Sequence, residues 1–238
     1  MLLFYIRHGD PIYDPDDLTE LGKRQAEAVA RRLSLYGLDR IYSSTSTRAR
    51  LTAEPTAQIL KKDVTELDWC KEAYAYQELS VQRDGCKPKW IFADEELRSI
   101  FVSNEVAALG HQWWEYPALS DPRYRSGYER IRDNTYAFLA EQGYVFDAQS
   151  GTYRATHENN QRIALFAHQG FGTAFMSALL NIPYPMYCTR FDMGHTGVTV
   201  IEFPDKIGSV IPTVLTLSND SHIYRDGLPT NYQNRIRF

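Results

Sequence analysis

The chain opens with Leu2-Leu3-Phe4-Tyr5-Ile6-Arg7-His8-Gly9-Asp10, an apolar run that ends at an arginine, a histidine and a glycine. Five successive apolar residues fit a fully buried strand and are too few for a globular helix. Arg7 and His8 then follow at the carboxyl end of this strand, where Gly9 lets the backbone turn. Ligands bind outside the carboxyl ends of strands in open α/β sheets, so His8 is a candidate site residue.

A second stretch of the sequence has the same design. Residues 162–172 read Arg-Ile-Ala-Leu-Phe-Ala-His-Gln-Gly-Phe-Gly, a buried strand that ends at His168 and leads through glycines into a helix. One histidine after a strand is more often an ordinary loop residue than a functional one. Two histidines in this position within one chain favour a shared site.

The bulk composition excludes several classes of protein. The 238 residues are 43% hydrophobic and 24% charged, as in an ordinary soluble domain with a substantial core. A net charge of -4 argues against a general nucleic-acid binder, which needs a basic face. Three widely spaced cysteines favour a reducing cytoplasm over a disulfide framework, and the first apolar run resembles neither a signal peptide nor a membrane span. We expect a cytoplasmic protein that binds neither nucleic acid nor membrane.

The remaining pattern alternates between helix and strand. Thr19 fits the N-cap of a helix that ends at Gly37, and Pro55 should kink a later helix without stopping it. Further helices are predicted over 94–109 and 128–142, and strands over 38–42, 63–69, 198–203 and 210–217, with a hairpin or long loop over 144–160.

The loop between Asp10 and Asp17 carries several carboxylates. It lacks the glycine and the terminal glutamate of a calcium loop, so we interpret it as a solvated turn and assign no metal to it. The hydroxyl cluster that starts at Ser43 precedes a helix, where it supplies caps, and Arg48 lies one turn inside that helix, where an anion could bind. Arg50 faces elsewhere on the same helix and is the less favoured contact.

These motifs in combination resemble the histidine phosphatase superfamily, which includes the cofactor-dependent phosphoglycerate mutases. The resemblance rests on Arg7-His8-Gly9, on Leu18 to Ala26, on Ser43, Ser44, Arg48, Ala49, Thr52 and Ala53, and on His168. It implies a three-layer α/β/α fold with a mostly parallel central sheet.

The resemblance also implies a phosphohistidine mechanism that needs neither metal nor cofactor. His8 would attack phosphorus, Arg7 and Arg48 would bind the phosphoryl oxygens, and His168, preferably protonated, would add a further donor. Gln169, next to it, is an additional candidate for substrate binding.

The proton donor of the family follows the third strand, in a segment that this chain matches loosely. Glu72 is the candidate for the general acid and base, and Glu78 is the alternative. Both carboxylates could instead lie in a solvated surface turn. His195 and His222, at the borders of the tail strands, are interpreted as structural or peripheral.

Residues from about 79 to 124 show no alternation of strand and helix and hold three of the four tryptophans: Trp90, Trp113 and Trp114. Family members carry a cap over the site at this point in the chain, so the resemblance implies an inserted cap within one domain. Its aromatic residues could stack on a substrate or form a small core of their own.

The function predicted from these residues is hydrolysis of a small phosphorylated substrate. A phosphomutase is the second hypothesis, disfavoured because the loop after Gly9 lacks the expected asparagine pattern. A phosphate-binding scaffold without turnover is the third. The oligomeric state stays open, with a homodimer among the options.

Overall fold

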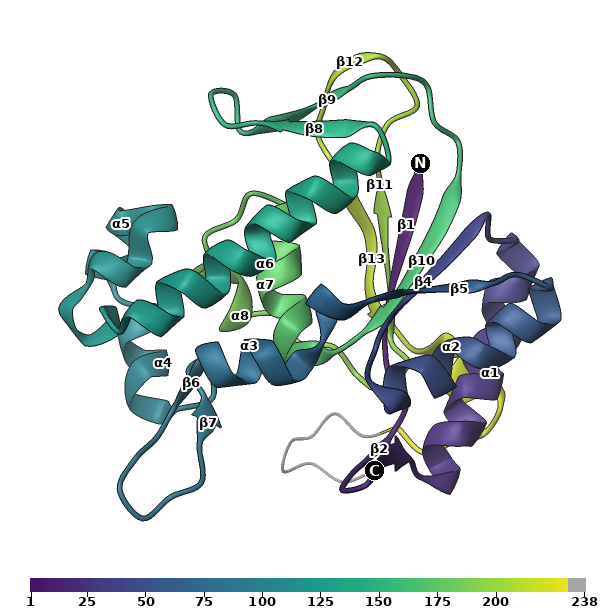
Figure 1. Cartoon of the computed structure of the whole chain (residues 1–238), viewed down its shortest axis with the longest axis horizontal. Helices are drawn as coiled ribbons and strands as arrows, with labels where there is room; N and C mark the ends of the chain where they lie inside the picture. The colour runs from purple at the N-terminus through teal and green to yellow at the C-terminus, as the bar shows by residue number, and fades with distance from the viewer. Residues whose placement is uncertain (231–238) are drawn as a thin grey trace.

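A six-stranded sheet forms the centre of the computed structural model, which describes residues 1–230 (Figure 1). Its strands, in sheet order, are β13 (Thr213–Asn219), β11 (Val198–Glu202), β1 (Leu2–Arg7), β10 (Arg162–Ala167), β4 (Arg40–Ser44) and β5 (Val64–Leu67). The pairs β1/β10, β10/β4 and β4/β5 are parallel, whereas β11 runs antiparallel to β1 and to β13. The sheet is therefore mostly parallel, as predicted.

Shorter strands form three small sheets around this centre. They are β2 (Pro11–Tyr13) with β3 (Asp16–Leu18), β6 (Ser80–Val81) with β7 (Lys89–Trp90), and β8 (Tyr144–Asp147), β9 (Thr152–Ala155) and β12 (Gly208–Val210). The α-helices are α1 (Glu20–Tyr36), α2 (Thr47–Leu60), α3 (Glu72–Glu78), α4 (Glu95–Phe101), α5 (Asn104–Leu109), α6 (Pro122–Glu141), α7 (Gln169–Leu179), α8 (Tyr184–Cys188) and α9 (Ser221–Arg225). Three 3₁₀ helices span Asp68–Cys70, Gly110–Glu115 and Pro117–Leu119. Among residues 1–230, no helix combines the length and the apolar composition that a bilayer crossing needs.

The alternation of side chains along β1 produces the layers. Leu3 and Tyr5 point into one hydrophobic core, which helices α6 and α7 complete, whereas Phe4 and Ile6 point into a second core with α1 and α2. Figure 1 shows these two pairs of helices on opposite sides of the sheet. The predicted three-layer α/β/α arrangement is confirmed.

Local signals set the ends of the helices on the α1 and α2 side. The Thr19 hydroxyl accepts a hydrogen bond from the Gly22 N–H at the start of α1, and Gly37 ends that helix at φ 68°. Helix α2 continues past Pro55 to Leu60, so the proline does not stop it, as expected.

Several predicted boundaries were wrong. The helix expected over 94–109 is two helices, because Ser103 caps a new one by accepting from the Val106 N–H. The helix expected from 128 begins at Pro122. The strand expected over 210–217 is split, since Val210 pairs with Tyr153 in the three-stranded sheet while β13 pairs with β11.

The segment from 79 to 124 holds β6, β7, α4, α5 and two of the 3₁₀ helices. Trp113 is fully buried in it and packs against Phe101 at 5.6 Å and against Tyr184 of α8 at 5.5 Å. Trp90 is only half-buried. Part of the segment therefore forms a core with the main body, and its identity as an inserted cap stays a prediction.

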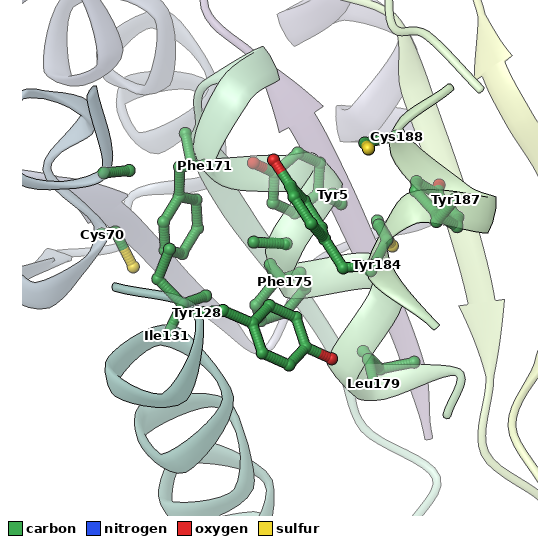
Figure 2. Packing of buried hydrophobic residues seen from close by; sticks show 14 of the residues in the cluster. Tyr5, Cys70, Tyr128, Ile131, Phe171, Phe175, Leu179, Tyr184, Tyr187 and Cys188 are labelled. Carbon is green, nitrogen blue, oxygen red and sulfur yellow. The ribbon is translucent and has the colours of Figure 1, made fainter. Parts of the chain in front are cut away.

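The core on the α7 side offers a test of packing. Phe175 is fully buried between Tyr5, at a ring distance of 5.3 Å, and Phe171, at 5.8 Å (Figure 2). We expect Phe175→Ala to lower the free energy of unfolding by about 3–5 kcal/mol, because the cavity adds to the lost transfer energy. Urea denaturation would measure this. Leu35→Ala, at a side chain that is 79% exposed, is the control and should change stability by less than about 0.5 kcal/mol.

Candidate active site

The parallel register of β1 and β10 brings the two strand-end histidines together. Arg7 is level with Ala167, so His8 and His168 leave the sheet side by side, and the His8 N–H donates to the Ala167 carbonyl at 2.9 Å. Their rings lie 5.2 Å apart, centre to centre. Two residues separated by 160 positions thus share one site.

The environment of His8 keeps its ring neutral and fixes its tautomer. Its Nδ1 lies 2.7 Å from the Gly9 carbonyl, which can only accept, so Nδ1 carries the proton and Nε2 keeps its lone pair. The side chain is buried, and this burial, followed by the nearby His168 and Arg7, holds the pKa of His8 well below its usual range. The Nε2 atom is therefore available as a nucleophile near neutral pH.

His168 is fully buried on the other side of this pair. Its Nε2 lies 2.8 Å from the Ser44 hydroxyl at the end of β4, and burial, together with Arg48 and Arg7, holds its pKa well below the usual value. This lowered pKa favours a neutral His168 in the free protein, and the protonated form during the reaction stays a prediction. With Ser44 donating to Nε2, the Nδ1–H of the neutral ring remains a hydrogen-bond donor.

Arg48, in the first turn of α2, contacts two carboxylates. Its Nη1 donates to Asp16 at 2.7 Å and its Nη2 donates to Glu72 at 3.1 Å. The other oxygen of Glu72 accepts from the Gly170 N–H at 2.8 Å, at the start of α7. Glu72 Oε2 also lies 3.6 Å from His168 Nδ1. Glu72 thus joins the arginine to the second histidine.

Arg7 completes a cluster of buried donors. Its Nη1 donates to the Met193 carbonyl at 2.6 Å, and burial lowers its pKa from the usual value without removing its charge. Within residues 1–230, Arg7 Nε, Arg48 Nε and His168 Nδ1 are all buried without a hydrogen-bond partner. Unpaired buried donors are costly, and an anion that accepts from them would remove that cost.

The structure separates the two candidate carboxylates. Glu78, at the end of α3, forms an ion pair with Arg130 at 2.6 Å and takes no part in the contacts around His8 and His168. Gln169 begins α7 and lines a neighbouring cavity of about 390 Å³, which Trp90 also lines. The geometry therefore brings Glu72, and not Glu78, to the histidines.

Asp16 and His195 lie at the site, although neither was predicted to be there. The turn of Asp16 is not merely solvated, because its carboxylate holds Arg48 and the Thr47 N–H. The His195 ring lies 5.7 Å from the ring of His8, and its Nδ1 is 3.4 Å from Asp10, so a peripheral position was wrong for it. A signal existed for His195, since a strand antiparallel to β1 begins at the edge where β1 ends.

His222 is buried and contacts Thr196 and Arg32. Its Nε2 is 3.0 Å from the Thr196 hydroxyl, and its Nδ1 is 3.4 Å from Arg32. Burial, followed by the charge of Arg32, lowers the pKa of His222 to about 4, and burial with Arg7 lowers the pKa of His195 to about 3.

These lowered pKa values predict how stability depends on pH. A histidine titrates near 6.5 in the unfolded chain, so below that pH the unfolded state binds more protons than the folded state. The free energy of unfolding is therefore highest above about pH 6.5. As the pH falls from there toward the pKa values of the folded state, it decreases by about 1.4 kcal/mol per pH unit for each such histidine. Denaturation at pH 7.5 and pH 5 would measure the slope, and His222→Asn should reduce it. Identical slopes in variant and wild type would contradict the burial of a neutral His222.

Three groups of the site could also contact a metal ion. In the described part of the chain, ligand atoms of His8, Glu72 and His168 lie within 4.8 Å of one another. Arg7 and Arg48 beside them raise the electrostatic cost of a cation, so the group suits an anion better. The absence of a metal stays a prediction.

The fold and the site together define an α/β protein with a buried cluster of histidines and arginines at the carboxyl ends of parallel strands. The family model of the histidine phosphatase superfamily (branch 1) matches residues 3–80. No curated protein matches the chain.

Solved structures share the fold over nearly the whole chain. Phosphoserine phosphatase from Entamoeba histolytica is 21% identical, with a TM-score of 0.59 over 93% of this chain and 98% of that one. The alpha-ribazole phosphatase from Shigella flexneri is 19% identical, with a TM-score of 0.56 over 92% and 97%. A mycobacterial glucosyl-3-phosphoglycerate phosphatase is 20% identical, with a TM-score of 0.56 over 91% and 98%. The match over residues 3–80 and the shared fold agree with the resemblance to the histidine phosphatase superfamily that the sequence predicted.

Proposed function

We propose that this protein hydrolyses phosphate monoesters through a phosphohistidine formed on His8. The observation that carries the proposal is a neutral, buried His8 with a free Nε2, next to buried donors of Arg7, Arg48 and His168 that lack partners within residues 1–230. The phosphatases that share the fold support the same general reaction.

The first step transfers the phosphoryl group to the protein. The Nε2 lone pair of His8 forms the N–P bond while the bond from phosphorus to the ester oxygen breaks. Arg7 and Arg48 bind the equatorial oxygens through charge-assisted hydrogen bonds, and the Nδ1–H of His168 adds a neutral donor. Glu72, in its protonated form, gives its proton to the departing alkoxide.

The second step returns the protein to its starting state. Glu72, now ionised, removes a proton from a water molecule whose oxygen attacks phosphorus, and the N–P bond breaks with its electrons returning to His8. Inorganic phosphate leaves. Because the donors are already fixed by the fold, neither step requires large reorganisation of the pocket.

Product analysis on a panel of phosphate esters tests this proposal. Hydrolysis releases inorganic phosphate, a mutase isomerises a phosphoglycerate without releasing it, and a scaffold binds esters without changing them. We expect stoichiometric phosphate release that persists after EDTA treatment. Isomerisation alone would favour the mutase hypothesis, and loss of activity that is restored by a divalent metal would contradict the metal-free mechanism.

A further inference from the structure

A cavity of about 710 Å³ opens beside the phosphate pocket. Arg48 and Glu72, which belong to the site, form part of its wall. The alcohol portion of a phosphate ester must extend away from the phosphoryl group, and Glu72 is the proposed proton donor to it. The residues of this cavity therefore face the part of the substrate that distinguishes one ester from another.

An aromatic side chain, Trp90, forms a fixed part of this wall. It is half-buried, stacks on Phe92 at 5.5 Å with ring planes 18° apart, and meets the edge of the Tyr76 ring at 5.1 Å. Tyr76 also lines the cavity, and its hydroxyl donates to the Pro88 carbonyl at 2.5 Å. A rigid ring held by its neighbours loses little entropy when a planar ligand packs on it.

Trp90 is also placed close to the catalytic turn. A Cβ atom at Gly170 would lie 2.2 Å from Trp90 Cζ2, so the ring occupies the space that any larger residue would fill. The same Gly170 donates its N–H to Glu72. Trp90 and the proposed acid Glu72 therefore both contact Gly170.

Two lysines add positive charge to the same wall. Lys71 precedes Glu72 and Lys87 lies in the loop before β7, and both line the cavity. The acidic groups of the wall, Asp16 and Glu72, are both held by Arg48. Among residues 1–230, neither lysine ammonium has a carboxylate within 4.0 Å. Lys71 Nζ lies 5.8 Å from the centre of the Tyr74 ring, a contact that leaves its charge uncompensated, so both lysines remain available to an anion on the ligand.

We propose that the natural substrate is a phosphate monoester whose alcohol portion carries a planar ring and a second anionic group. The ring packs on Trp90 and Tyr76, and the second anion binds Lys71 and Lys87. This substrate class rests on the proposed phosphatase function.

Four primary alkyl esters with similar leaving groups test the two features separately: ethyl phosphate, 2-carboxyethyl phosphate, benzyl phosphate and 4-carboxybenzyl phosphate. We expect kcat/KM to rise about tenfold for the ring and several-fold for the carboxylate, with 4-carboxybenzyl phosphate best. The carboxylate effect should weaken with salt, because the lysines are partly exposed. 4-Phosphonobenzyl phosphate shows whether the second group is preferred as a carboxylate or as a phosphoryl dianion.

Variants assign the two effects to residues. Trp90→Leu should remove the kcat/KM advantage of the benzyl esters over ethyl phosphate, a ratio in which any shared effect on Glu72 cancels, whereas Trp90→Phe should keep part of that advantage. The double variant Lys71→Gln/Lys87→Gln should remove only the advantage of the carboxylates. Lys89→Gln is the matched control, because Lys89 is exposed beside Trp90 but does not line the cavity.

The outcomes separate this proposal from the function on which it rests. Equal kcat/KM for all four esters, or variants that lower all four equally, would overturn the substrate class while phosphatase activity stands. If no ester is hydrolysed, calorimetry with 4-carboxybenzylphosphonate and ethylphosphonate still tests the cavity. Tighter binding of the first, lost in Trp90→Leu, would support the ligand class without the reaction, and equal binding would overturn it.

Discussion

His8→Ala is expected to lower kcat/KM for every phosphate monoester by about 10⁴-fold or more, because it removes the only proposed nucleophile. His8 contributes a free Nε2, whereas the Nε2 of His168 lies 2.8 Å from the Ser44 hydroxyl. Steady-state kinetics on 4-nitrophenyl phosphate would measure the loss. Rapid acid-free quenching with a labelled substrate should find the label on His8 in the wild-type protein.

His157→Ala is the matched control for this experiment, because His157 is an exposed histidine outside the site. It should keep wild-type activity and labelling. Unfolding curves must show that His8→Ala is folded, so that the loss reports chemistry. Label retained by His8→Ala would assign the phosphoenzyme to another residue and contradict the proposal.

Glu72→Gln is expected to slow the hydrolysis of an alkyl phosphate by about 10²- to 10⁴-fold, the usual size of general acid–base catalysis. A nitrophenolate leaves almost without protonation, so the first step with 4-nitrophenyl phosphate should be affected much less. The same glutamate is proposed to activate water, so the variant should accumulate phosphohistidine even with the activated ester. Burst kinetics and label trapping would measure both effects.

Glu78→Gln provides the comparison for the glutamate assignment. Glu78 contacts Arg130 and not the histidines, so its loss should affect stability more than the choice of leaving group. Equal slowing of both esters by Glu72→Gln without trapped phosphoenzyme would contradict its role. A selective loss in Glu78→Gln would transfer that role to Glu78.

The elements that the sequence predicted well are those whose own residues determine them. β1 and β10 are continuous apolar runs that end at a histidine, and this local pattern was sufficient to place His8 and His168 at one edge of a parallel sheet. Helix α1 carries its own cap at Thr19 and its own stop at Gly37. The motif around Arg48 is one continuous stretch of chain, from the end of β4 into the start of α2.

The parts that the sequence did not predict depend on contacts between distant segments. The local sequence shows Asp16 only as a carboxylate in a turn, because its partner Arg48 comes from another segment. His195 reaches His8 through the pairing of β11 with β1, and Val210 joins β9 through a register that no local pattern specifies. The composition of a short polar segment is compatible both with a solvent-exposed turn and with a place in a functional site, so the sequence does not distinguish the two.

The missing side chain at Gly170 links the choice of substrate to the rate of the reaction. Its bare Cα makes room for the Trp90 ring, and its N–H holds Glu72. A substitution at Trp90, in β7, would therefore reach the proposed proton donor through Gly170 as well as the binding surface. In evolution, a change of leaving group would have to keep the proposed acid, Glu72, in place. Substitutions at Lys87 and Lys71 therefore offer an easier route to altered specificity than a substitution at Trp90.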